Sequence, residues 1–305
     1  MLVKPDLSRI GLLGYGTVGR SVADILDGSN CRIIRVGVRD IAKYEANPGH
    51  IHPSRFTDDP YSVIEDPSVK AVLEATGGTV PALKLAKRCL QLGKPFITAN
   101  KELIATHFDE LGNHPLVRYE AAVAAAIPIV EDLKRLSVYD EILSIEGIMN
   151  GTTNYMLTEM AGGVSYESVL KQAQDLGYAE ADPTSDVGGF DAGFKISILG
   201  SIASKKFITA GEVNTTGIIG ITEEELARAK AEKKVIKLIA SFDGKTCSVG
   251  PQMLDLDHPL ARVNGSMNAI SVTLKNAGTL FWQGPGAGGS ATASAMLKDL
   301  AQFQA

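Results

Sequence analysis

The feature of this sequence that most constrains its fold is a glycine-rich turn near the N-terminus. A short apolar run at residues 9–13 is typical of a buried strand, and a helical pattern of apolar residues follows from Val22 onward. Between them the chain reads Gly14-Tyr15-Gly16-Thr17-Val18-Gly19. In this setting the first glycine permits a tight turn, the second lets a pyrophosphate approach the backbone, and the third allows the helix to press on the strand. The pattern predicts a dinucleotide-binding turn made by these six residues.

The end of the next predicted strand indicates which dinucleotide is preferred. The apolar run 32–38 ends at Arg39, where folds selective for NAD place an acidic residue that binds the ribose hydroxyls. Arginine there, with Lys43 nearby, favours a ribose 2′-phosphate, so we expect NADP to be preferred. NAD remains an alternative because Asp40 follows directly and could reach a ribose. A further alternative is that Arg39 and Lys43 form an ordinary solvated face.

Two later strand signals bring more residues toward the same ligand. Residues 69–75 and 95–98 are apolar runs, and in a doubly wound parallel sheet ligands bind outside the C-terminal ends of the strands. We therefore expect an α/β protein whose N-terminal part, residues 1–130, is a Rossmann-like, doubly wound nucleotide domain. The residues expected beside the cofactor at these strand ends are Thr76, Gly77, Thr98 and Lys101.

Length and composition limit the number of domains, the partners and the cellular compartment, but they do not indicate a function. The 305 residues exceed a typical single core, so a second domain is expected. The net charge of −5 gives no basic footprint for nucleic acid or an anionic membrane, and no apolar run is long enough to span a bilayer. The three cysteines, Cys31, Cys89 and Cys247, are odd in number and lack metal-ligand spacing, which indicates a reducing compartment. We expect a cytoplasmic protein with neither nucleic acid nor a membrane as partner.

The second half of the chain places a lysine inside a largely apolar helical stretch. Lys195 follows Asp191 by four residues, a spacing that puts both charges on one helix face, and the residues after it indicate that this face packs inward. A buried lysine needs a carboxylate partner and a function, and proton transfer is such a function. We expect this pair in an α+β substrate and dimerisation domain at residues 131–285. A C-terminal helix within 286–305 should return toward the nucleotide domain.

Acidic residues gather ahead of that lysine. Glu180, Asp182, Asp186 and Asp191 fall within about a dozen residues. Acidic loops are commonly just solvated. A cluster interrupted by glycines and directed at an inward lysine is better explained by a small substrate that carries an ammonium group.

Motifs in both halves of the chain occur in an order known from one enzyme family. They are residues 14–19, Thr98-Ala99-Asn100-Lys101, the stretch from Asn150 to Tyr155, the stretch from Gly177 to Pro183, Asp186 with Asp191 and Lys195, and Gly284-Pro285-Gly286-Ala287-Gly288-Gly289. Together they resemble a homoserine dehydrogenase of the short, monofunctional type. The resemblance implies reversible, NAD(P)-dependent interconversion of L-homoserine and L-aspartate 4-semialdehyde, a step toward threonine, methionine and isoleucine.

The resemblance also implies a role for single residues. Lys195 matches the family's general acid/base, with Asp191 as its acidic partner and Lys101 as a second lysine at the reacting oxygen. Gly286 matches a cofactor-binding glycine. The residues that the resemblance places around the substrate are Gly151, Thr152, Tyr178, Glu180 and Asp186.

A loop at residues 120–128 matches one that often binds a monovalent cation in the family. The resemblance implies Na⁺ or K⁺ held by Glu120 and by the backbone carbonyls of Val123, Ala125 and Ile127. Relatives usually carry glycines where residues 124–126 are alanines, and alanine resists the positive φ angles that glycine accepts. Family likeness also implies a homodimer. With sixteen residues after Gly289, we expect no effector-binding domain and hence no threonine feedback through one.

Two other functions compete with this interpretation. An aldehyde dehydrogenase acting through a cysteine thioester would need an exposed, activated cysteine beside a histidine, and none of the three cysteines fits well. A catalytically silent, NADP-sensing protein would keep the glycine turn but would have no use for Asp191 and Lys195. An assay of NADPH consumption with aspartate semialdehyde, and of the oxidative direction with and without phosphate, separates the three.

Overall fold

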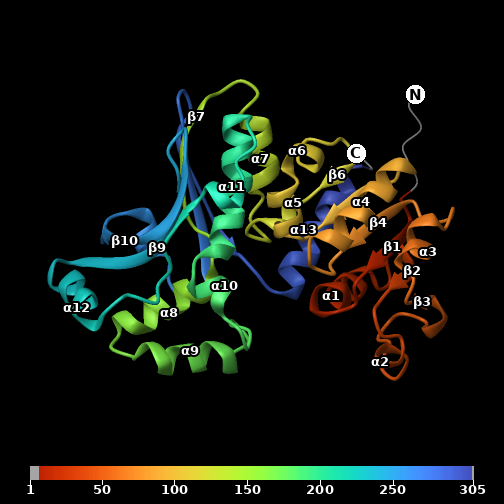
Figure 1. Cartoon of the computed structure of the whole chain (residues 1–305), viewed down its shortest axis with the longest axis horizontal. Helices are drawn as coiled ribbons and strands as arrows, with labels where there is room; N and C mark the ends of the chain where they lie inside the picture. Colours follow the sequence, from red (N-terminus) through yellow and green to blue (C-terminus); the bar gives the residue numbers. More distant parts are fainter. Residues whose placement is uncertain (1–6, 304–305) are drawn as a thin grey trace. The chain divides into compact units, whose positions relative to one another are not determined.

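The computed structural model describes residues 7–303, apart from the side chain of Glu45. The chain divides into two compact units (Figure 1). Unit 1 comprises the described parts of Met1–Ala126 and Ala287–Ala305, and unit 2 comprises Ile127–Gly286. The breaks at 126/127 and 286/287 lie close to the predicted limits at 130/131 and 285/286. That the units are independently folding domains stays a prediction.

Unit 1 is built on a six-stranded parallel sheet with the order β3-β2-β1-β4-β5-β6. This is the doubly wound order 3-2-1-4-5-6, so the predicted Rossmann-like fold is confirmed. Apolar runs such as β1 and β4 are almost wholly buried because helices cover both faces of such a sheet. The strands are β1 Arg9–Leu13, β2 Arg32–Gly37, β3 Phe56–Thr57, β4 Ala71–Glu74, β5 Phe96–Thr98 and β6 Val117–Arg118.

Helices connect these parallel strands, as crossover connections require. They are α1 Thr17–Leu26, α2 Ala42–Glu45, η1 Pro53–Arg55, α3 Pro60–Glu65, α4 Val80–Gln91, α5 Lys101–Thr106, α6 Phe108–Leu111 and η2 Glu120–Ala122. The strand order reverses between β1 and β4, and in open α/β sheets ligands bind at such a switch point. The fold therefore places the glycine turn after β1 and the loop after β4 at the same edge of the sheet.

Unit 2 combines a second six-stranded sheet, in the order β12-β11-β7-β9-β10-β8, with helices. Its strand pairs are antiparallel except for β10 with β8. This agrees with the expected α+β architecture. Its strands are β7 Ile142–Ile148, β8 Asn214–Thr215, β9 Lys234–Phe242, β10 Cys247–Asp255, β11 Met267–Leu274 and β12 Gly278–Pro285. Its helices are α7 Ile129–Leu136, α8 Gly151–Ala161, α9 Tyr166–Asp175, α10 Thr184–Val187, α11 Phe190–Ser204, η3 Ala210–Glu212, α12 Glu223–Ala231 and η4 Pro259–Arg262.

The last helix, α13 Gly289–Gln302, packs with the N-terminal elements of unit 1 (Figure 1). Gly289 is needed at its start because a Cβ there would lie 2.5 Å from the Ser21 hydroxyl. Further along, the Asp299 carboxylate accepts a 2.8 Å hydrogen bond from the backbone N–H of Glu120. Burial raises the pKa of Asp299 to about 7. Within residues 7–303 no helix is both long and apolar enough to cross a bilayer.

Replacing Asp299 by asparagine should make the stability of the protein less dependent on pH. Since the folded-state pKa of Asp299 lies above the usual aspartate value, its contribution to folding is complete below about pH 4 and is lost as the pH rises through about 7. An asparagine can still accept the Glu120 hydrogen bond without a buried charge. We expect Asp299→Asn to be roughly 2–4 kcal/mol more stable than the wild type at pH 8 and to lose this advantage by about pH 4. Urea unfolding at both pH values measures this, and an advantage independent of pH would contradict it.

Candidate active site

The glycine turn has the geometry predicted for it: a tight turn at Gly14, open space at Gly16 and close packing at Gly19. Gly14 has φ +92°, and a Cβ there would lie 2.6 Å from the carbonyl oxygen of Ala75 on the neighbouring strand end. A Cβ on Gly19 would lie 2.2 Å from the Gly14 carbonyl oxygen, whereas a Cβ on Gly16 would meet open space. No side chain caps α1 and no acid lies in its first turn. The start of α1 therefore presents backbone N–H groups suited to an anion.

A cavity of about 680 Å³ opens in unit 1 beside this turn. Arg39 and Lys43 line it, as do Thr76 and Gly77 from the loop after β4. Both basic side chains are exposed, and Asp40 lies between them in the lining with its carboxylate 3.4 Å from the backbone nitrogen of Lys43. The cavity thus joins the glycine turn to the two cationic groups that the sequence singled out. Its size is in the range of small-molecule and cofactor sites.

Three of the predicted cofactor residues turn their side chains into the protein instead. The Tyr15 ring packs edge-on against Tyr44 and Phe56, and its hydroxyl donates to the Pro48 carbonyl. Val18 packs against the same core, and the Thr98 side chain is fully buried. That these three residues bind the cofactor stays a prediction, and their packed side chains favour a contact through the backbone.

A carboxylate that sequence reasoning missed organises the loop after β4. Glu74 is fully buried and accepts hydrogen bonds from the N–H and hydroxyl of Thr76, at 2.7 and 2.6 Å, and from the Thr98 hydroxyl at 2.5 Å. The Thr98 hydroxyl in turn accepts from the N–H of Asn100. An acid at the end of an otherwise apolar strand was the available signal, because a buried carboxylate requires several donors.

Lys101 is the first residue of α5 and is held there by a well-made cap. The Asn100 side chain accepts from the N–H of Leu103 at 3.0 Å, and its amide donates to the Gly78 carbonyl at 2.7 Å. The cap fixes where α5 begins and therefore where Lys101 lies at the edge of the parallel sheet. Whether its ammonium meets the same substrate as Lys195 stays a prediction.

In unit 2 the predicted lysine and carboxylate form a buried ion pair. Lys195 Nζ donates to Asp191 Oδ2 at 2.7 Å and to the Met149 carbonyl at 2.6 Å, and the two residues are only 7% and 6% exposed. α11 is buried along most of its length and positions both side chains, since residues four apart share a face. Among the described residues these are the only two acceptors of the Lys195 ammonium, which leaves one of its three hydrogens for a substrate oxygen.

Asn150 connects this ion pair to a third acidic residue. Its amide nitrogen donates to Asp186 Oδ1 at 2.7 Å and to Asp191 Oδ2 at 2.9 Å, while its oxygen caps α8 by accepting from the N–H of Thr153. Asn150 belongs to one of the predicted motifs, but no role was predicted for it. An asparagine before the helical stretch from residue 151 was the signal, because asparagine is a preferred helix cap.

The predicted acidic cluster is smaller than expected. Asp186 and Asp191 join through Asn150, but Asp182 instead accepts from the N–H and hydroxyl of Thr184, the first residue of α10. Glu180 is exposed, and its side chain makes no hydrogen bond or ion pair within residues 7–303. The Tyr178 carbonyl accepts from the Thr152 hydroxyl at 2.6 Å. The Tyr178 ring is 43% exposed and packs edge-on against Tyr155.

The loop after η2 adopts positive φ angles, a conformation that alanine was expected to resist. Ala124 and Ala125 have φ of 55° and 40°, in the left-handed region. Alanine resists this conformation but does not prevent it here, where both residues are buried in the packed protein. The carbonyls of Val123 and Ala125 accept no hydrogen bond from the described residues, although both residues are buried. Glu120 is 2% exposed.

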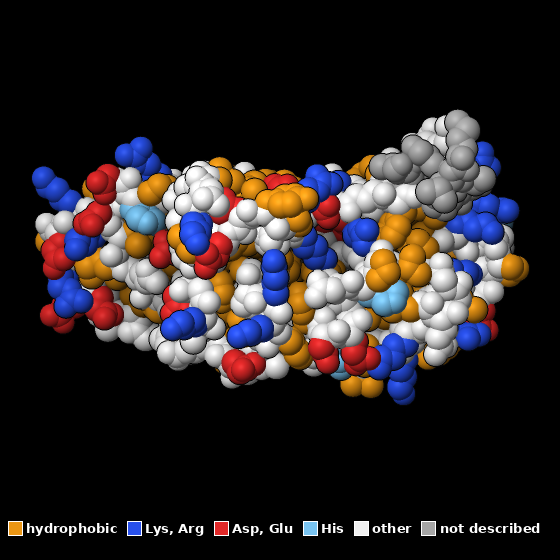
Figure 2. Space-filling model, turned by 90° about the horizontal axis from the view of Figure 1, so that it is seen from above, with side chains coloured by type: hydrophobic (Ala, Val, Ile, Leu, Met, Phe, Trp, Pro, Cys, Tyr) orange, Lys and Arg blue, Asp and Glu red, His pale blue; other side chains and the backbone are white. Residues whose placement is uncertain are grey.

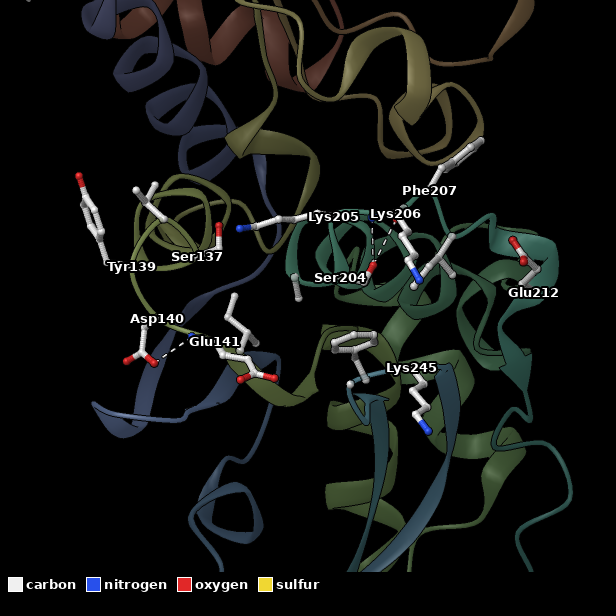
Figure 3. A pocket seen from close by; sticks show the side chains of 16 residues that line it. Ser137, Tyr139, Asp140, Glu141, Ser204, Lys205, Lys206, Phe207, Glu212 and Lys245 are labelled. Atoms are coloured by element: carbon white, nitrogen blue, oxygen red, sulfur yellow. Dashed lines mark hydrogen bonds between the residues drawn. The ribbon is translucent and has the colours of Figure 1, made fainter.

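Two other features of the structure bear on the site by contrast. The 920 Å³ cavity in Figure 3 lies at the ends of α7 and α11, and none of the predicted site residues lines it. Cavity size alone therefore does not mark the chemistry here. Burial raises the pKa of Cys89 and of Cys247 to about 12, which disfavours a thiolate nucleophile at either position. On the face shown in Figure 2, positive and negative side chains are interspersed.

Comparison with known proteins agrees with both halves of this site. The family model for the NAD-binding domain of homoserine dehydrogenase matches residues 14–114, and the homoserine dehydrogenase model matches residues 128–301. The homoserine dehydrogenase of Corynebacterium glutamicum is 39% identical over 95% of this chain and 70% of its own length. That of Bacillus subtilis is 38% identical, with 96% and 72% covered.

Solved structures give the same result. A homoserine dehydrogenase from Thiobacillus denitrificans superposes with a TM-score of 0.89 at 35% identity, covering 97% of this chain and 73% of that one. A hyperthermophilic archaeal homoserine dehydrogenase in complex with NADPH superposes with a TM-score of 0.82 at 27% identity, with 97% of each chain covered.

A dinucleotide-binding turn in one unit and a buried lysine–carboxylate pair in the other define an NAD(P)-dependent oxidoreductase. The matches narrow this class. The chain belongs to the homoserine dehydrogenase family. It is an oxidoreductase that interconverts L-homoserine and L-aspartate 4-semialdehyde, and the expected reaction is confirmed.

Proposed function

We propose that Lys195 is the general acid/base of this reaction, with Asp191 as its partner and Lys101 as a second cation at the reacting oxygen. The observation that carries the proposal is the buried contact of 2.7 Å between Lys195 Nζ and Asp191 Oδ2, with one ammonium hydrogen left over. Bound NAD(P) supplies the acceptor or donor of the hydride at the substrate carbon. The residues proposed to hold that cofactor are Gly14, Tyr15, Gly16, Thr17, Val18, Gly19, Arg39, Lys43, Thr76, Gly77, Thr98, Lys101 and Gly286.

The proton chemistry falls to the chain's own residues. In the reducing direction Lys195 stabilises the growing negative charge on the former carbonyl oxygen and donates a proton to it. In the oxidising direction the neutral amine takes the hydroxyl proton. Asp191 and the Met149 carbonyl hold two of the lysine's hydrogens and so fix the direction of the third. Water is limited at this point because both side chains are more than nine-tenths buried.

The substrate's amino-acid end is proposed to bind at the first turn of α8 and the acids beside it. Asn150 holds Asp186 and Asp191 in place, and the two carboxylates suit an ammonium group. The remaining substrate residues of this proposal are Gly151, Thr152, Tyr178 and Glu180. For Tyr178 the ring's contact with Tyr155 leaves an exposed edge, and for Glu180 the exposed carboxylate has no other partner among the described residues.

NADP preference is proposed to depend on Arg39. Arg39→Ala should raise the KM for NADP by about tenfold or more, because a charge-assisted contact to the 2′-phosphate is lost. The KM for NAD, which has no such phosphate, should change by less than about twofold. Initial rates with each cofactor measure both values. Arg35→Ala is the matched control, since Arg35 lies on β2 just before Arg39 but pairs with Asp66. Equal weakening of both cofactors by Arg39→Ala would contradict the assignment.

A monovalent cation, Na⁺ or K⁺, is proposed at the loop after η2. Buried carbonyls without a hydrogen bond at Val123 and Ala125, near the buried Glu120, fit an oxygen-binding cation. Ile127 belongs to the other unit, and its carbonyl already accepts from the N–H of Ile129. Activity in buffer free of alkali metal, titrated with KCl or NaCl, tests this; activity independent of both salts would remove the cation from the proposal.

A cytoplasmic homodimer is the proposed state of the protein. The three cysteines are free thiols, as a reducing compartment allows. β12 lies at the edge of its sheet, where one side of the strand has no partner strand among the described residues. Three apolar side chains in unit 2 are exposed: Phe281 on β12 (41%), Val138 (60%) and Leu143 (42%). A strand edge and exposed apolar side chains suit contact with a second copy. Light scattering after size exclusion gives the mass in solution, and a monomer at micromolar concentration would exclude the dimer.

A further inference from the structure

Unit 2 contains a second buried lysine that the proposed chemistry does not use. Lys237 lies on β9, opposite Gln252 of β10, and is 2% exposed (Figure 1 shows both strands). Its ammonium donates to Asn154 Oδ1 at 2.9 Å, to the Val263 carbonyl at 2.6 Å and to Asn264 Oδ1 at 3.0 Å. None of the salt bridges within residues 7–303 includes it. All three of its partners are neutral.

Such a lysine is costly to keep, and its surroundings are made to fit its charged form. Burial is the only cause that lowers its pKa, to about 8, so the ammonium still predominates at pH 7. An ammonium has three hydrogens and no acceptor capacity, and three acceptors surround it. An apolar side chain would serve a purely structural position as well or better. The network therefore indicates a geometric requirement.

The groups that Lys237 joins identify that requirement. Asn154 lies on α8, and its amide nitrogen donates to the carbonyls of Val263 and Met267 at 3.1 and 3.0 Å. One turn earlier, Gly151 approaches the same segment so closely that a Cβ would lie 2.6 Å from the Ser266 carbonyl oxygen. The segment from Val263 to Met267 thus contacts α8 at two successive turns. Through its hydrogen bonds to Asn154 and Val263, Lys237 connects α8 and this segment to β9 of the sheet.

We propose that Lys237 is a positioning residue for the substrate site: its ammonium holds α8 against residues 263–267 and so fixes the first turn of α8. That turn carries Gly151 and Thr152, and its cap Asn150 orients Asp186 and Asp191. The inference rests on the substrate-binding role proposed above for this turn. It assigns Lys237 no contact with the substrate.

Lys237→Met tests the proposal in the full-length enzyme. We expect the KM for homoserine to rise by about tenfold, because the substrate-binding turn is no longer fixed, while kcat changes by less than about threefold. The KM for NADP should stay within about twofold. Lys94→Met is the matched control: Lys94 likewise donates to neutral acceptors, the backbone carbonyls of Ile64 and Asp66, but lies in unit 1. It should leave the homoserine KM unchanged.

The alternatives give different results. An unchanged homoserine KM in Lys237→Met overturns the proposal, and so does a fall in kcat alone, which would report only less folded enzyme. If Lys237→Met does not fold, Asn264→Leu removes one acceptor at an exposed side chain and should still raise the homoserine KM. Thr152→Val tests substrate binding at the α8 turn separately from the positioning role of Lys237. It raises the homoserine KM if the α8 turn binds substrate, and leaves it unchanged if that assignment itself fails.

Discussion

Replacing Lys195 by alanine should lower kcat by about two to four orders of magnitude in both directions, as removal of a general acid/base does. The alanine can neither donate a proton to the reacting oxygen nor stabilise its charge. Cofactor binding should be nearly unaffected, because the glycine turn and the Arg39 cavity belong to the other unit. Stopped-flow or steady-state rates with aspartate semialdehyde and NADPH, alongside fluorescence titration of NADPH, measure both effects.

A matched control for this variant lies just beyond the same helix. Lys206→Ala removes an exposed lysine two residues after the end of α11 and should retain full activity. Turnover of Lys195→Ala within about threefold of the wild type would remove Lys195 from the mechanism. Loss of NADPH binding together with turnover would mean that the substitution had disturbed more than proton transfer.

Removing the partner carboxylate should have its largest effect on stability. Asp191→Ala leaves the Lys195 ammonium buried with the Met149 carbonyl as its remaining acceptor, and breaking a buried pair on one side costs about 3–5 kcal/mol. We expect the free energy of unfolding to fall by about that amount, and kcat to fall as well because the lysine is no longer oriented. Urea unfolding followed by circular dichroism measures the first quantity.

Two companions make this experiment specific. Asp182→Ala, which removes an exposed carboxylate that accepts hydrogen bonds from Thr184, should cost only about 1 kcal/mol. The double substitution Asp191→Leu with Lys195→Met replaces the whole ion pair by apolar groups and should recover most of the lost stability while remaining inactive. If Asp191→Ala alone were as stable as the wild type, the ion pair would not be buried as the structure shows it.

The sequence predicted the parts of the site that depend on local spacing. The glycine turn was predictable because each glycine answers a short-range steric demand, and the structure shows those demands at Gly14 and Gly19. The Asp191–Lys195 pair was predictable because residues four apart share a helix face. The boundaries of β1 at residues 9–13 also follow from the local pattern.

Long-range partners were not predictable in the same way. Asn150 bonds to Asp186 and Asp191, which lie 36 and 41 residues later, and no spacing rule connects positions so far apart. Lys237 was not singled out from the sequence, because its partners Asn154 and Val263 lie far from it along the chain. The acidic cluster was predicted to be larger than it is. Glu180 and Asp182 are near Lys195 in the sequence, but neither contacts it in the structure.

What the sequence determined by itself was the kind of enzyme: a glycine turn for a dinucleotide, a lysine with its carboxylate on one helix face, and the family that combines them. Tertiary structure decided which polar groups act together and which merely meet solvent. Tyr15 and Thr98 were predicted to lie beside the cofactor from their positions in the sequence. In the structure the Tyr15 ring packs in the core, and the Thr98 hydroxyl donates to Glu74. The physical reason is that a buried polar group must find its partners wherever the packed chain supplies them, and packing is not a local property.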